Sequence, residues 1–121
     1  MPFKESSKFA TVSKTVTATS AGASADVVYT VPLHHSSRIV FLHLANGTNS
    51  TKKAYVQYYD NSTTQYHSIL NGLSMAGHTT HDVVQSNSIY LSPGDKIVAY
   101  IEAGMTLDLT VSAEEYYEPS R

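Results

Sequence analysis

Apolar and polar residues alternate along most of this chain, in short runs separated by turn-forming residues. The clearest run is 106–111, where Thr and Asp alternate with Leu and Val. A period of two places successive side chains on opposite faces and is typical of a half-buried β-strand. No stretch of about ten or more residues combines a helical period with capping residues. The chain is therefore predicted to be all-β.

Turn-forming residues divide the pattern into nine segments, or eight strands if the sixth and seventh form one bent strand. The run 38–45 is nearly continuous in apolar residues, which is typical of a central strand covered on both sides. Residues 71–77 are predicted to be a flexible excursion, and Asp95 a turn residue after Pro93-Gly94. The predicted strands are 11–19, 26–31, 38–45, 52–60, 63–70, 78–85, 88–91, 97–102 and 105–113.

Short strands separated by turns at regular spacing indicate a sandwich or a barrel. We predict an antiparallel β-sandwich of about eight strands, jelly-roll-like, over residues 11–113. Residues 1–10 are predicted to form an N-terminal arm and residues 114–121 a C-terminal tail. A Greek-key sandwich of immunoglobulin type is the alternative, but its Cys–Trp–Cys signature is absent.

The composition changes this picture mainly through its low charge. The 121 residues suffice for one domain, and only 15% of them are charged, against roughly 25% in typical domains. Ser and Thr supply the remaining polarity. A sparsely charged surface suits a protein packed against copies of itself or a larger body. The Ser and Thr content also follows from β-propensity and loops alone, so both interpretations stay open.

Several partners are not expected. A net charge of −2 without clustered Lys and Arg gives no surface for nucleic acid. No apolar run approaches the ~18 residues of a membrane span, and residues 1–8 do not read as a signal peptide. The absence of cysteine fits synthesis in a reducing cytoplasm.

Candidate chemistry is weak throughout the chain. His34 and His35 are adjacent and would point to opposite faces of a strand, and no His-x-His spacing of a cupin-like metal site occurs. There is no Gly-x-Ser-x-Gly and no cysteine for nucleophilic catalysis. Most carboxylates fall in turns or on the polar side of a strand. We therefore predict no enzyme activity, no catalytic residue, no metal and no cofactor.

The nine tyrosines, with no tryptophan, are the most unusual part of the composition. Four of them fall on residues 55–66, on two strands joined by a short turn. If Tyr58 faces the core, alternation makes Tyr55 and Tyr59 face outward. Cross-strand packing and a recognition surface are both open interpretations. The candidate interface residues are Phe3, Phe9, Tyr55, Tyr59, Tyr66, Tyr116 and Tyr117.

Asn46, Asn49 and Asn61 each begin a glycosylation acceptor pattern. All three fall in predicted turns, where asparagine is favoured for its own backbone hydrogen bonds. We interpret the three patterns as turn chemistry.

Four sequence motifs give the chain a family resemblance: Tyr29-Thr-Val-Pro32, Arg38-Ile-Val40, Leu91-Ser-Pro-Gly-Asp-Lys-Ile97 and Leu107-Asp-Leu-Thr-Val-Ser112. With them the chain resembles small β-sandwich virion proteins of tailed bacteriophages, of the head decoration (cement) or neck and tail accessory type. The likeness spans about residues 15–113 and concerns layout. The Tyr-rich hairpin 52–70 departs from it, since shorter members have a simple turn there. No functional residue can be carried over.

The resemblance implies a virion structural protein, most specifically a capsid decoration subunit that bridges major capsid proteins. Its expected partners are copies of itself, for example in a trimer, and the major capsid protein or another virion protein. A neck or tail component is the nearest alternative. A carbohydrate- or receptor-binding module with Tyr55, Tyr59 and Tyr66 as a stacking platform is another. A cupin-type enzyme is the least favoured hypothesis.

Overall fold

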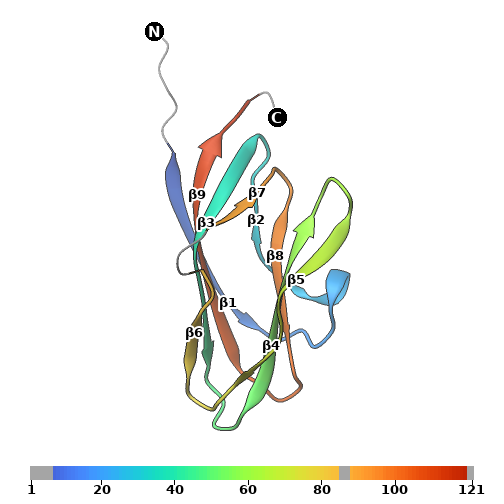
Figure 1. The fold of residues 1–121 in the computed structure, drawn as a ribbon, viewed down its shortest axis with the longest axis vertical. Helices are drawn as coiled ribbons and strands as arrows, with labels where there is room; N and C mark the ends of the chain where they lie inside the picture. The colour runs from blue at the N-terminus through green and yellow to red at the C-terminus, as the bar shows by residue number, and fades with distance from the viewer. Residues whose placement is uncertain (1–6, 85–87, 120–121) are drawn as a thin grey trace.

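The computed structural model describes residues 7–84 and 88–119 of the chain. In these residues nine strands form two antiparallel sheets that pack face to face (Figure 1). The predicted all-β sandwich is confirmed. The elements are β1 Lys8–Val16, η1 Gly22–Ser24, β2 Asp26–Thr30, β3 His35–Asn46, β4 Lys52–Asp60, β5 Gln65–Met75, β6 Thr80–Asp82, β7 Ile89–Leu91, β8 Lys96–Ile101 and β9 Leu107–Tyr117.

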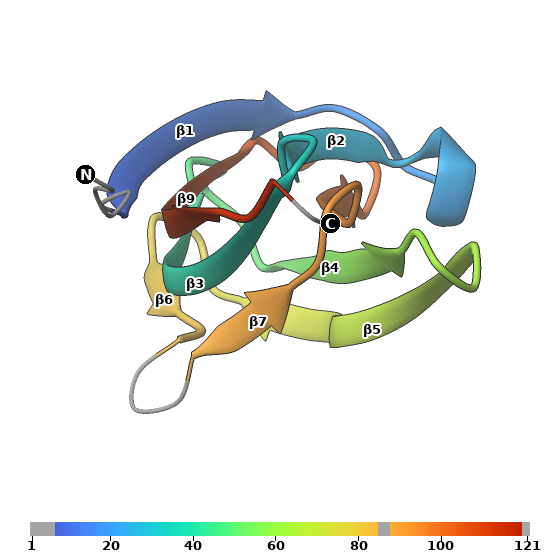
Figure 2. The ribbon, with the colours of Figure 1, turned by 90° about the horizontal axis from the view of Figure 1, so that it is seen from above.

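The topology is that of one long hairpin wrapped into two layers. β4 pairs with β5 next to it in sequence, β3 with β6 and β7, β2 with β8, and β1 with β9. Two further pairings, β3 with β9 and β4 with β8, complete the two sheets. Sheet A therefore has the order β1-β9-β3-β6, with β7 also on β3, and sheet B the order β2-β8-β4-β5 (Figure 2). This distribution of successive strands over two sheets is a jelly roll.

The core lies between the inner faces of the two sheets. Alternation along β3 and β9 turns Leu42, Leu44 and Val111 inward, and Val56 and Ile97 face them from sheet B. All five side chains are fully buried. Burying an aliphatic side chain of this size contributes roughly 1.5–3 kcal/mol, so this layer is the main source of stability.

The outer limits of the sandwich differ from the prediction. β1 begins at Lys8 and β9 continues to Tyr117, so placing residues 8–10 in the arm and 114–117 in the tail was wrong. The β1–β9 ladder runs from the pair Lys8 and Glu115 to the pair Val16 and Leu107. Residues 8–10 and 114–117 do not alternate clearly between apolar and polar, and backbone pairing of β9 with β1 and with β3 holds them in the sheet.

Two internal predictions were also wrong. β5 does not stop at residue 70 but continues to Met75, because a bulge at Gly72, with φ of +83°, keeps the strand paired to β4. β3 is central but not covered on both sides: its outward Phe41 is 38% exposed. The sixth and seventh segments are separate and short, and pair with opposite ends of β3. β4 matches its predicted range in full.

Asp95 is confirmed as a turn residue. Its N–H donates to the carbonyl oxygen of Ser92 at 3.0 Å, and Gly94 has a φ of +83°, as a type II turn requires. The buried carboxylate also accepts from the N–H groups of Ser92 and Asn61, both at 2.9 Å. Asp95 thus joins the turn before β8 to the turn between β4 and β5.

Candidate functional site

The outer face of sheet A carries most of the large apolar side chains that the fold leaves exposed. Phe9, Glu114, Arg38 and Tyr90 are successive register partners across β1, β9, β3 and β7, so they form one row. Phe9 is 66% and Tyr90 74% exposed. Phe41 and Tyr116 are also exposed and flank the row on the same face. We call Phe9, Phe41, Tyr90 and Tyr116, with the charged pair between them, the sheet A surface.

An ion pair occupies the centre of this surface. Arg38 donates to Glu114 Oε1 from Nη2 at 2.6 Å and from Nε at 3.2 Å. Ser7 Oγ donates to Glu114 Oε2 at 2.7 Å. These bonds, first that from Ser7 and then those from Arg38, lower the pKa of Glu114 to about 2. The pair links β3 to β9 at the centre of the sheet A surface.

The ion pair of Arg38 and Glu114 should affect stability in acid. The lowered pKa of Glu114 means that its stabilisation is complete above the ordinary value of 4.5 and is lost as the pH falls through about 2. We expect Glu114→Gln to lower the melting temperature at neutral pH, and the difference from wild type to vanish near pH 2. Circular dichroism melts between about pH 7 and pH 2 measure this. A difference that is constant over this range would contradict the predicted role of the ion pair.

Hydroxyl groups cover the rest of the outer face of β1 and β9. Thr11 pairs with Ser112 and Ser13 with Thr110, each with 2.9 Å between the oxygens, and Thr15 donates to Asp108 at 2.6 Å. The hydroxyls therefore satisfy one another. On β3, the ring of His43 stacks on Phe41, and His43 Nδ1 lies 2.5 Å from Asp82 Oδ1. A polar area thus borders the sheet A surface.

One end of the sandwich adds two more exposed apolar side chains. Tyr117 ends β9 and contacts the ring of His35 at a centroid distance of 5.4 Å. Leu33, in the turn before β3, is the other. β1 begins and β9 ends at this same end (Figure 1). The apolar surface therefore extends from the face of sheet A to the end of the sandwich.

The outer face of sheet B carries two pairs of tyrosines, Tyr55 with Tyr100 and Tyr59 with Tyr66. Tyr58 packs against the core, and Tyr55 and Tyr59 face outward, as the alternation predicts. Tyr55 stacks on Tyr100 of β8, with ring centroids 4.4 Å apart and planes 6° apart. Tyr59 contacts Tyr66 at 4.7 Å, and Lys96 Nζ lies 5.3 Å from the centre of the Tyr59 ring.

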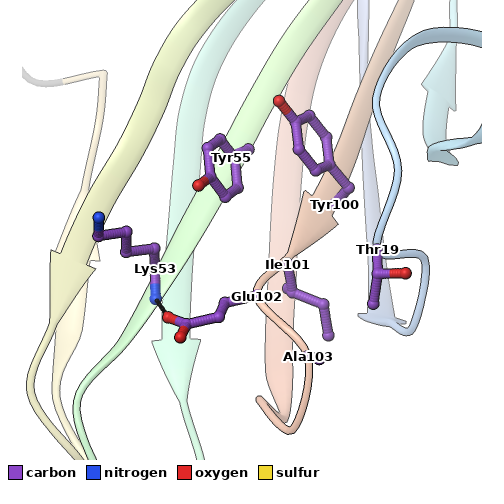
Figure 3. A pocket seen from close by; sticks show the side chains of 7 residues that line it. All are labelled: Thr19, Lys53, Tyr55, Tyr100, Ile101, Glu102 and Ala103. Atoms are coloured by element: carbon purple, nitrogen blue, oxygen red, sulfur yellow. Dashed lines mark hydrogen bonds between the residues drawn. The ribbon is translucent and has the colours of Figure 1, made fainter.

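A cleft of about 500 Å³ lies beside the stacked pair of Tyr55 and Tyr100. Lys53 and Glu102 line it on one side and Thr19 on another (Figure 3). The prediction did not include Tyr100 as a site residue. The alternation along the predicted strand 97–102 places Tyr100 on its polar side, but the sequence does not indicate that β8 pairs with β4.

The predicted interface residues therefore fall on separate surfaces. Phe9 and Tyr116 lie on sheet A and Tyr117 lies at the end beside it. Tyr55, Tyr59 and Tyr66 lie together on sheet B. Phe3 lies outside the described residues. Sequence reasoning missed Phe41, Tyr90 and Tyr100. A role in binding stays a prediction for all of these residues.

Within residues 7–84 and 88–119, no group of three or more His, Asp or Glu side chains could hold a metal ion. In the same ranges no helix is long and apolar enough to cross a membrane. No family model, no curated protein and no solved structure matches the chain significantly.

Proposed function

We propose that this protein is a structural subunit that works by assembly, with the sheet A surface packed against another protein. In keeping with the resemblance to phage virion proteins, its place is the virion of a tailed bacteriophage. There it serves as a capsid decoration (cement) subunit that bridges major capsid proteins. The observation that carries the proposal is the sheet A surface, where strand pairing gathers four exposed aromatic side chains from β1, β3, β7 and β9 around one ion pair.

The physical chemistry of this surface favours protein contact. Large apolar side chains gathered on one face of a monomer mark interaction sites, whereas single exposed ones are ordinary. Tyrosine, phenylalanine and arginine are enriched in the buried centres of interfaces. Arg38 is already paired with Glu114, so docking would not strand a lone charge in the interface. The hydroxyl-rich area beside the sheet A surface is suited to a polar rim.

Assembly also fits what the rest of the chain provides. The closely packed jelly roll gives a rigid body, and a rigid body loses little conformational freedom on docking. A homo-oligomer with closed symmetry, such as a trimer, would repeat the contact. Many weak copies of one contact stiffen a shell through avidity. A neck or tail component would use the same surface against a different neighbour.

The test is the oligomeric state of the full chain and of a Phe9→Ser/Tyr90→Ser variant. We expect wild type to associate with itself or to sediment with phage particles, and the variant to lose at least tenfold in affinity. Light scattering coupled to size-exclusion chromatography, and co-sedimentation, measure both. Val27→Ser is the matched control, because Val27 is an exposed apolar residue on sheet B. Wild type that binds neither itself nor particles would refute the proposal, as would a variant that assembles normally.

A further inference from the structure

The cleft on sheet B has a built wall. Residues 17–25 connect β1 to β2 and pass beside the outer face of sheet B. Gly22 lies over the ring of Tyr66 there, since a Cβ added to it would be 3.8 Å from the ring. Gly22 N–H donates to Gln57 Oε1 at 3.0 Å, which ties this loop to β4. The Ile101 N–H donates to the Ala18 carbonyl oxygen at 2.9 Å, which ties it to β8.

Asp26 fixes the start of the same loop. Its Oδ2 accepts from the N–H groups of Thr17 at 2.7 Å and Ala18 at 3.0 Å. The bond from Thr17 is the main reason that the pKa of Asp26 is lowered. Thr19, the loop residue that lines the cleft, follows directly. The wall is therefore held at four points before any ligand arrives, and preformed sites lose less entropy on binding.

The opposite side of the cleft presents a fixed carboxylate. Glu102 Oε1 accepts from the backbone N–H of Lys53 at 2.9 Å, and the Glu102 N–H donates to the Lys53 carbonyl oxygen at 3.0 Å. This reciprocal pair holds Glu102 at the end of β8, with the residue on the wall of the cleft. Figure 3 shows Glu102 and Lys53 below the rings of Tyr55 and Tyr100.

We infer that this cleft binds a neutral saccharide. A sugar ring has an apolar C–H face, which packs on aromatic rings, and a hydroxyl edge that both donates and accepts. Tyr55 and Tyr100 supply the aromatic side, Glu102 an acceptor and Lys53 a donor. Because the one carboxylate and the one ammonium cancel, the cleft does not favour an anionic or a cationic ligand. Its volume of about 500 Å³ lies in the usual range for small-molecule sites, roughly 300–1,000 Å³.

This inference uses a different face from the proposed assembly surface. A subunit docked through sheet A would leave sheet B free to face outward. The two can therefore fail independently.

The test begins with the full chain on an array of neutral and charged glycans. The best neutral oligosaccharide is then titrated by calorimetry, with tyrosine ring protons followed by NMR. We expect millimolar or tighter binding with shifts at Tyr55 and Tyr100. Glu102→Gln keeps an oxygen that accepts from the Lys53 N–H but removes the negative charge. It should weaken binding by a factor on the order of ten, as expected when a hydrogen bond to a charged group is lost. Thr19→Trp should block the cleft.

Tyr100→Ala should abolish binding. If that variant fails to fold, the two surface variants at Glu102 and Thr19 still decide the matter. Tyr90→Ala, on sheet A, is the matched control and should bind as wild type. The inference is wrong if no neutral glycan binds at millimolar concentration. It is equally wrong if only charged glycans or peptides bind, or if binding survives both Thr19→Trp and Glu102→Gln.

Discussion

Replacing Asn46 with alanine is expected to lower the free energy of unfolding by about 2–4 kcal/mol. Asn46 ends β3, and its side chain is only 2% exposed. At this buried position the amide has four backbone partners, and the two hydrogens of Nδ2 are shared among three carbonyl oxygens. Nδ2 donates to the carbonyl oxygens of Ser50 at 3.2 Å, Met75 at 3.1 Å and Ala76 at 3.2 Å, and Oδ1 accepts from the Thr48 N–H at 2.9 Å.

The size of the effect follows from what alanine leaves behind. It removes the partner of several backbone groups at once, and an unsatisfied buried group costs about 1–3 kcal/mol. The bonds also tie the turn after β3 to the end of β5, so both segments would loosen together. Asn46→Asp should be worse still, because it turns a carboxylate toward three carbonyl oxygens. The interpretation of Asn46 as turn chemistry, rather than a glycan acceptor, agrees with this occupied amide.

Urea denaturation of wild type and both variants measures the effect. Asn49→Ala is the matched control: Asn49 lies in the same turn but is exposed, and surface changes usually stay within about 0.5 kcal/mol. If Asn46→Ala were as stable as Asn49→Ala, the hydrogen bonds of the Asn46 amide would contribute nothing net. The turn would then be held by its backbone alone.

The inward and outward directions of the side chains could be predicted because a period of two is a local property. Tyr55, Tyr58 and Tyr59 are the best example. Once Tyr58 faces the core, alternation along β4 turns Tyr55 and Tyr59 outward. The central place of β3 and the turn at Asp95 were predictable for the same reason, since each depends on a few adjacent residues.

The candidate surfaces could not be predicted because they are made by strand pairing. Phe9 and Tyr90 lie in one row only because β9 and β3 stand between β1 and β7. Tyr100 meets Tyr55 only because β8 pairs with β4. Such pairs join residues far apart in the sequence, and no local pattern records them. The bulge at Gly72 was missed likewise, because glycine reads equally as a loop signal.

Replacing Tyr29 with phenylalanine is expected to cost about 2–3 kcal/mol, although the ring is kept. Tyr29 lies on β2 of sheet B and is 6% exposed, and Glu115 on β9 of sheet A is 5% exposed. The Tyr29 hydroxyl donates to Glu115 Oε2 at 2.5 Å and lies 2.7 Å from Ser37 Oγ of β3. This buried polar cluster links the two sheets, and phenylalanine would leave the carboxylate without its donor.

A pH series separates this effect from simple loss of packing. Burial, and then the hydrogen bond to Glu115, raise the pKa of Tyr29 well above its ordinary value of 10.0. The neutral hydroxyl is therefore favoured in the fold. Its stabilisation is complete below about pH 10, where the unfolded tyrosine is also neutral, and is lost as the pH rises toward the folded pKa. The advantage of wild type over Tyr29→Phe should therefore shrink as the pH rises above about 10, since the other tyrosines are common to both proteins.

A double-mutant cycle with Glu115→Gln completes the argument. If the hydroxyl and the carboxylate stabilise each other directly, the two changes together should cost less than the sum of their single effects. The expected interaction energy is about 0.5–3 kcal/mol, the range for residues in contact. Additive effects, with a difference between wild type and Tyr29→Phe that does not vary with pH, would mean that the cluster does not couple the two sheets. The rigidity of the sandwich would then come from its apolar layer alone, and the sheet A and sheet B surfaces would be held in place without a polar link between them.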